Sequence, residues 1–259
     1  MDLFVRETGP ARAPTIVFLH GGRMSGWSWE PVVERMREYR CLVPDLPQYG
    51  RSVGRGPFEI GRAADAVAAL IRSRADAGRV HVVGLSLGAQ VGVQLLATVP
   101  DVVDRAVLCG TMVNALPWVR PTQFLVKSSV RVAWSRRLLG RRWSARPANV
   151  PPARSGDYLR DSRLIEQPEF VDIVTASAGF TIPVGLDKTD SPTLFLSGAE
   201  ETWFVRRSAA VLAQTMPKGI DRIAIAMGHT WPLCHPDLFS RTVLGWLTDT
   251  ALPPEITAP

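Results

Sequence analysis

A chain of 259 residues is long enough to bury one sizeable core, so we expect a single domain. Hydrophobic residues make up 46% and charged residues 21%, a balance that excludes an intrinsically disordered chain. The formal net charge of +6 comes almost wholly from arginine, and no aromatic nucleic-acid-binding signature accompanies it, so we expect no nucleic-acid partner.

Short apolar runs alternate with amphipathic helical patterns along most of the chain. Continuous rather than alternating hydrophobicity is typical of strands buried on both faces, as in a parallel sheet flanked by helices. The predicted strands cover 15–19, 40–43, 80–83, 105–108, 193–196 and 221–226. The predicted helices cover 27–38, 60–77, 87–98, 206–216 and 237–248. This repetition predicts an α/β fold with a mostly parallel, doubly wound sheet.

The rhythm is interrupted between residues 112 and 190, where no parallel strand is predicted. Helical patterns occur around 122–139, 156–165 and 169–176, joined by a link rich in proline and arginine. An insertion of this size in a compact α/β domain is usually functional, although it can also complete the core. We therefore predict a core formed by 1–111 and 191–259 and a helical lid formed by 112–190.

One stretch of this insertion, Arg131 to Arg146, holds six arginines among apolar residues. Such a stretch can lie on anionic lipid or bind a phosphate-bearing carrier protein. The solvated outer face of a surface helix is the simpler interpretation, and we favour it over membrane or carrier-protein contact.

The cysteines, Cys41, Cys109 and Cys234, are odd in number and lie far apart. This spacing favours a reducing compartment over a disulfide scaffold or a zinc site. The N-terminal residues MDLFVRETG contain no apolar signal core, and no apolar run reaches membrane-spanning length. We therefore expect a cytoplasmic protein. Because no clustered metal ligands or phosphate-binding loop are visible, we also expect no metal and no cofactor.

The sharpest motif is VGLSLG, in which Gly84-Leu85-Ser86-Leu87-Gly88 joins an apolar strand to a helix. This context predicts a nucleophile elbow, a tight turn that lifts Ser86 above the sheet edge. Glycine at 84 and 88 removes the Cβ atoms that would clash with the turn and the packed helix. The helix N-terminus favours negative charge that develops on an oxyanion. We predict Ser86 as the nucleophile.

A serine hydroxyl needs a base to remove its proton, and the chain holds four histidines. His81 lies inside a predicted strand, His20 ends an earlier one, and His235 precedes the final helix. His229 stands in a loop directly after the last apolar strand, which is the position that favours it as the base.

Five segments, FLHGGRMSGWSW, VPDLPQYGRS, VGLSLG, LFLSGAEE and AMGHTWP, together resemble the α/β-hydrolase superfamily over nearly all of the chain. The resemblance is specifically to its lid-bearing esterase, lactonase and C–C hydrolase branch. It implies a lid inserted after the sixth family strand. It also implies an oxyanion hole made by the backbone amides of Gly22 and Leu87, with Arg23 as the neighbouring alternative to Gly22.

The resemblance further implies an acid in a Gly-x-x-Asp turn after the lid, which reads Gly198-Ala199-Glu200-Glu201 here. Counting from Gly198 favours Glu201, and a slip of one residue would select Glu200. The acid would hold the imidazole tautomer and stabilise the imidazolium, and Ser-His-Glu triads are accepted variants. No acid follows Cys109, at the strand end that supplies this residue in some family members.

Aromatic residues near these motifs could form an apolar acyl pocket or belong to the core. They are Trp118, Phe124, Trp203, Trp231 and Tyr49. The resulting prediction is a cofactor-free serine hydrolase that cleaves a small to medium hydrophobic ester or lactone. The alternatives are a lyase or C–C bond hydrolase using the same triad, and a non-catalytic ligand receptor with this fold.

Overall fold

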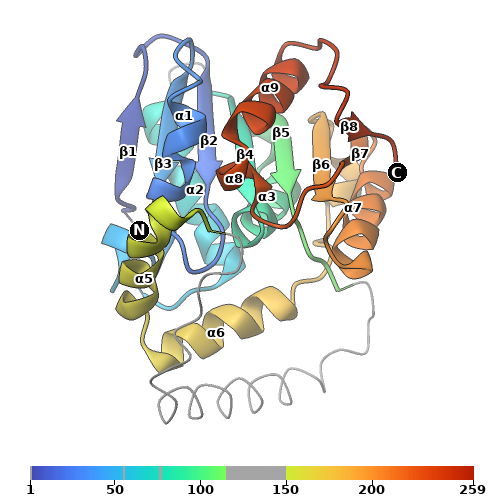
Figure 1. Ribbon diagram of the computed structural model, residues 1–259. Helices are drawn as coiled ribbons and strands as arrows, with labels where there is room; N and C mark the ends of the chain where they lie inside the picture. The colour runs from blue at the N-terminus through green and yellow to red at the C-terminus, as the bar shows by residue number, and fades with distance from the viewer. Residues whose placement is uncertain (1, 55, 76–77, 115–149) are drawn as a thin grey trace.

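A twisted sheet forms the centre of the molecule (Figure 1). The computed structural model describes residues 2–54, 56–75, 78–114 and 150–259. Within this part the sheet has eight strands in the order β1-β3-β2-β4-β5-β6-β7-β8. The strands are β1 (Val5–Thr8), β2 (Thr15–Leu19), β3 (Arg40–Pro44), β4 (Val80–Leu85), β5 (Val103–Cys109), β6 (Thr193–Gly198), β7 (Gly219–Ala224) and β8 (Ile256–Thr257).

The strands from β2 to β7 run parallel, and antiparallel strands close both edges. This arrangement confirms the predicted mostly parallel, doubly wound fold. The two edge strands were not predicted from the sequence, because β1 is polar and largely exposed and β8 has two residues. The chain runs outward from β2 to β3 and then returns to β4 on the other side of β2. The carboxyl ends of β2 and β4 therefore flank a switch point, where ligands bind in open α/β sheets.

Helices cover both faces of the sheet, and Figure 1 shows α1, α8 and α9 together on one of them. The helices described are α1 (Glu30–Val33), α2 (Ile60–Arg74), α3 (Leu87–Thr98), α5 (Ser155–Leu164), α6 (Gln167–Ala178), α7 (Trp203–Thr215), α8 (Trp231–Cys234) and α9 (Pro236–Leu247). Consecutive residues of β2 pack into two different hydrophobic clusters. Val17 and Leu19 pack with residues of α2 and α3. Ile16 and Phe18 pack with residues of α9. This alternation explains why the strand is continuously apolar. None of the described helices is both long and apolar enough to cross a membrane.

The predicted helix over 27–38 is wrong. The structure instead contains a 3-10 helix, η1 (Gly26–Trp29), followed by the single turn of α1. Pro31 explains the difference, because in a helix that began at 27 its ring would clash with the carbonyl of Trp27. The apolar spacing of this segment reflects burial of Trp27 and Trp29, which are 3% and 1% exposed.

The interval between β5 and β6 contains α5 and α6, close to the helices predicted over 156–165 and 169–176. Both lie at the carboxyl ends of the parallel strands, drawn at the bottom of Figure 1. The helix predicted over 122–139 lies outside the described residues. The domain boundaries at 112 and 190 remain predictions.

Candidate active site

Ser86 occupies a strained turn between β4 and α3. Its φ of 53° and ψ of −112° lie in a region that residues with a Cβ atom rarely adopt. The backbone amide of Ser86 donates to the carbonyl of Cys109 on β5 at 2.8 Å, which ties the turn to the neighbouring strand. The structure thus places the half-buried Ser86 at the tip of a strand–turn–helix unit, as the sequence motif predicts.

Gly88 allows α3 to approach β2 closely. A Cβ atom at Gly88 would overlap the carbonyl group of Leu19, the last residue of β2. Since backbone atoms cannot yield as a flexible side chain can, any other residue would push α3 away from β2. The close approach brings the loop that follows β2, beginning at His20, next to the elbow.

His229 is paired with Glu201 rather than with Glu200. The imidazole Nδ1 is hydrogen-bonded to Glu201 Oε1, and the side chain of Glu201 is only 2% exposed. The other carboxylate oxygen, Oε2, accepts from the Gly198 amide at 2.8 Å. Glu200 is exposed. Counting from Gly198 in the sequence therefore selects the carboxylate that the structure brings to the histidine.

Gly110, which sequence reasoning did not single out, packs directly against this pair. A Cβ atom at Gly110 would lie 2.8 Å from His229 Cε1, 3.0 Å from His229 Nδ1 and 3.3 Å from Glu201 Oε1. The φ of Gly110 is +65°, and its amide donates to Leu196 at 2.8 Å. Because Cys109 accepts from the Ser86 amide and Gly110 packs against the imidazole, the dipeptide at the carboxyl end of β5 supports both sides of the site.

Replacing Gly110 with alanine should lower kcat/KM by about 10²-fold, because the new methyl group would displace the His229 ring from its carboxylate partner. Gly61→Ala provides a matched control, since a Cβ atom at that helical position meets nothing within 4 Å. Steady-state kinetics of the two variants would measure the effect. Equal activity of Gly110→Ala and wild type would show that the imidazole tolerates displacement from this position.

His20 shapes the loop after β2 and is fully buried. Its Nε2 accepts from the Leu46 amide at 2.9 Å, so its Nδ1 carries the proton and donates to the Gly21 carbonyl at 2.9 Å. Burial lowers the pKa of His20 and keeps the imidazole neutral. Both ring nitrogens are thus used to hold the loop, which leaves His20 a structural role.

Tyr49 supports the same loop from inside the core and is 1% exposed. Its ring packs edge-on against His20, with 5.0 Å between ring centroids. Burial raises the pKa of the Tyr49 phenol, and a hydrogen bond with the Arg23 backbone opposes that shift. Tyr49 acts here as loop support rather than as an exposed pocket wall.

The other aromatic candidates have different environments. Trp231 is 1% exposed and packs edge-on against Phe239, with 5.0 Å between ring centroids. Trp203 is 67% exposed at the start of α7. Trp118, Phe124 and the arginine-rich stretch Arg131 to Arg146 lie outside the described residues.

A cavity of about 570 Å³ lies beside His229. It is lined by Met112, Glu200, Glu201, Thr202, Val205, Ala226, Gly228, His229, Thr230, Trp231, Cys234 and His235. Within the described ranges, no cluster of three or more His, Cys, Asp or Glu side chains is arranged to hold a metal ion.

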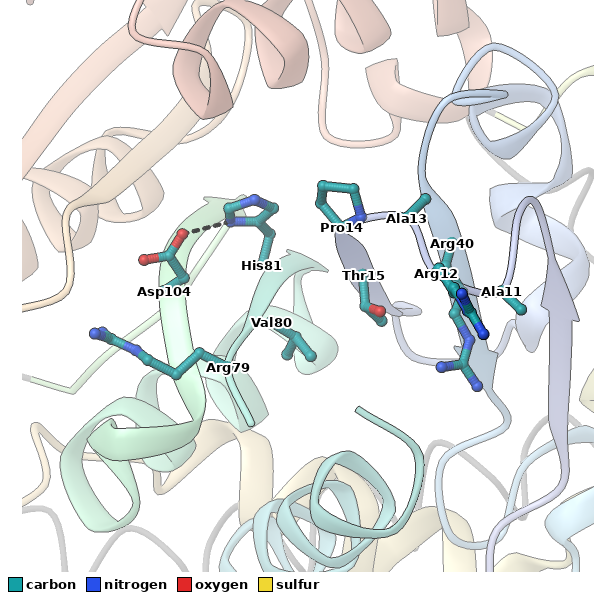
Figure 2. Close-up of a pocket in the computed structure, with 10 residues that line it drawn as sticks. All are labelled: Ala11, Arg12, Ala13, Pro14, Thr15, Arg40, Arg79, Val80, His81 and Asp104. Atoms are coloured by element: carbon teal, nitrogen blue, oxygen red, sulfur yellow. Dashed lines mark ion pairs between the residues drawn. The ribbon is translucent and has the colours of Figure 1, made fainter. Parts of the chain in front are cut away.

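A second cavity, of about 560 Å³, lies at the amino ends of β2, β4 and β5, opposite the elbow (Figure 2). His81 and Asp104 form an ion-pair contact of 3.4 Å there, and burial lowers the pKa of His81. Arg40 is held by Glu7 at 2.8 Å, and Arg79 donates to Val103 at 2.6 Å. Both arginines are therefore engaged in contacts that hold neighbouring segments together at the amino ends of the strands.

A parallel sheet that presents a serine at a strained turn and a carboxylate-bound histidine at the same edge is typical of α/β hydrolases. A model of the alpha/beta hydrolase family matches residues 16–242, and the chain belongs to this family. Membership of the α/β-hydrolase superfamily, which the sequence motifs predict, is therefore confirmed.

Named proteins are similar to parts or to nearly all of the chain. An AB hydrolase superfamily protein of Gibberella zeae is 34% identical, but the match covers 42% of this chain and 39% of that protein. A pimeloyl-[acyl-carrier protein] methyl ester esterase of Pectobacterium carotovorum is 25% identical over 93% of this chain and 96% of its own. The enol-lactonase of Burkholderia xenovorans LB400 shares the fold, with a TM-score of 0.74 and 22% identity over 95% of this chain and 96% of its own.

Proposed function

We propose that this protein is a serine hydrolase that cleaves a small to medium hydrophobic carboxylic ester or lactone through an acyl-enzyme. The observation that carries the proposal is the buried Glu201 bound to His229 Nδ1, at the sheet edge that carries Ser86. A carboxylate in this place keeps the proton on Nδ1 and leaves Nε2 to accept the serine proton. The relatives named as an esterase and an enol-lactonase support acyl transfer as the reaction class.

The reaction proceeds by attack of Ser86 Oγ on the substrate carbonyl while His229 takes the hydroxyl proton. Backbone amides of Gly22 and Leu87 stabilise the oxyanion. Leu87 suits this role because it is the first residue of α3, where amides have no acceptor within the helix. The imidazolium then protonates the leaving alkoxide, and water activated by His229 releases the acid and restores Ser86.

Helix α5 supports a lid role for the inserted segment. Trp27, which follows the loop after β2, donates its indole N–H to Asp161 of α5 at 2.6 Å. The Arg23 guanidinium lies 4.9 Å from the centroid of the Tyr158 ring, also on α5. Helix α5 thus packs beside the proposed oxyanion loop, where it would help to shape the acyl pocket and exclude water.

Two alternatives predict different behaviour. A non-catalytic receptor has no need of the Ser86 backbone conformation, which costs of order 1–3 kcal/mol to maintain. A C–C bond hydrolase or lyase would use the same residues on a different substrate.

A series of p-nitrophenyl esters of increasing acyl length tests the proposal, with a serine-directed phosphonate as a parallel probe. We expect serine-dependent turnover with a maximum at short to medium chains. Labelling of Ser86 without ester turnover would favour the C–C hydrolase or lyase. If Ser86 is not labelled and no ester is turned over, the hydrolase proposal is refuted and a receptor is favoured.

A further inference from the structure

A polar side chain stands among the buried, otherwise apolar residues of the helix that follows the proposed nucleophile. Gln90 of α3 is 1% exposed. Its backbone amide donates to the carbonyl of Ser86 at 3.0 Å, as part of the helix, and leaves the side-chain amide to find other partners. A primary amide is costly to bury unless its donors and acceptor find partners. The Gln90 side chain therefore requires an explanation from its contacts.

The Gln90 carboxamide joins the start of the inserted segment and the last turn of α6 to the nucleophile helix. Its Nε2 donates to the carbonyl of Met112 at 2.8 Å and to that of Ser177 at 3.0 Å. Its Oε1 accepts from the Ser177 hydroxyl at 2.8 Å. Met112 lies where the chain leaves the sheet after β5, and Ser177 lies in the last turn of α6.

A second buried side chain joins the same segment to the helix that follows the proposed acid. Ser208 of α7 is 3% exposed, and its hydroxyl accepts from the Val113 amide at 3.2 Å while donating to Phe204 at 2.8 Å. The backbone amide of Asn114, which follows Val113, donates to the carbonyl of Phe180 at 2.7 Å. Residues 112–114 are thus bound by α3, by α7 and by the returning chain.

These contacts form a junction, defined here as Gln90, Ser177, Ser208 and the backbone of 112–114. The junction connects all three proposed catalytic positions. Helix α3 starts directly after Ser86, and helix α7 starts two residues after Glu201. Gly110, which packs against His229, lies two residues before Met112. Buried, fully satisfied hydrogen bonds hold such elements in one arrangement. A shift of α3 relative to α7 would break several of them.

We propose that Gln90 is a positioning residue that, through this junction, holds Ser86 in register with His229 and couples that register to the seating of the inserted segment. The inference rests on the proposed serine hydrolase function. Gln90 acts through Ser86 and the 110–114 segment and takes no part in proton transfer.

The test compares Gln90→Met with Gln94→Met, which makes the same change on the same helix at a half-buried position. Methionine retains the length of glutamine and removes its hydrogen bonds. The rate is expressed per active site titrated with the phosphonate, so that loss of folded protein does not contribute. We expect Gln90→Met to lower kcat about tenfold with KM nearly unchanged, because small misplacements of reacting groups are costly. Gln94→Met should match wild type.

Ser177→Ala provides a milder variant, since it removes the hydroxyl but leaves both Nε2 hydrogen bonds of Gln90 in place. We expect a smaller loss than in Gln90→Met, and a double variant no worse than Gln90→Met alone. A wild-type kcat per titrated site in both single variants, or a change confined to KM, would overturn the inference. Absence of serine-dependent turnover in wild type would instead overturn the proposed function.

Discussion

Ser86→Ala should abolish ester turnover, lowering kcat by roughly 10³- to 10⁶-fold, as expected when a nucleophile that acts together with its base is removed. The loss reflects chemistry rather than folding, because alanine retains the Cβ atom and the φ of +53° at the elbow. Initial rates on the best p-nitrophenyl ester, with mass spectrometry after phosphonate treatment, would measure it. Turnover within tenfold of wild type would exclude Ser86 as the nucleophile.

Ser86→Gly tests whether the backbone at this position is strained. Glycine adopts a positive φ without steric cost, so this variant should be inactive yet more stable than Ser86→Ala by about 1 kcal/mol. Chemical denaturation of the two variants would compare their free energies of unfolding. Equal stabilities would mean that the elbow stores no backbone strain at Ser86.

Glu201→Gln should lower kcat by about 10²- to 10⁴-fold, the scale seen when a triad acid is replaced by its amide. The structure supplies the reason. One side-chain oxygen of Glu201 must accept from the Gly198 amide, and the other faces His229 Nδ1. A glutamine that keeps its oxygen on Gly198 presents its NH₂ to Nδ1, which then becomes the acceptor. The imidazole proton moves to Nε2, where it blocks proton abstraction from Ser86.

Glu200→Gln is the matched control, because it makes the same change at the adjacent, exposed position. We expect its kcat to lie within about twofold of wild type, as for a surface substitution that breaks no buried contact. The ratio of the two kcat values would decide between the carboxylates. A larger loss in Glu200→Gln would mean that the acid shifts register during catalysis.

Local signals in the sequence were enough to predict the parallel sheet and the elbow. Strands buried on both faces need continuous apolar runs, so β2, β4 and β6 are visible without any tertiary information. The elbow is equally local, since its glycines and serine lie within five residues. The helix over 27–38 failed because apolar spacing reports burial as well as helicity, and the steric effect of Pro31 was decisive.

Other features of the site depend on residues far apart in the chain. No local signal distinguishes Gly110 or Gln90, since their importance arises from contacts with His229 and with Met112 and Ser177. The choice between Glu200 and Glu201 needed only a count of residues, but the bonds of Glu201 to Gly198 and His229 exist only in the folded chain. The sequence by itself determined the fold class and the chemical groups. The tertiary structure decided which groups meet, because only the packing of β5 between β4 and β6 brings these distant segments together.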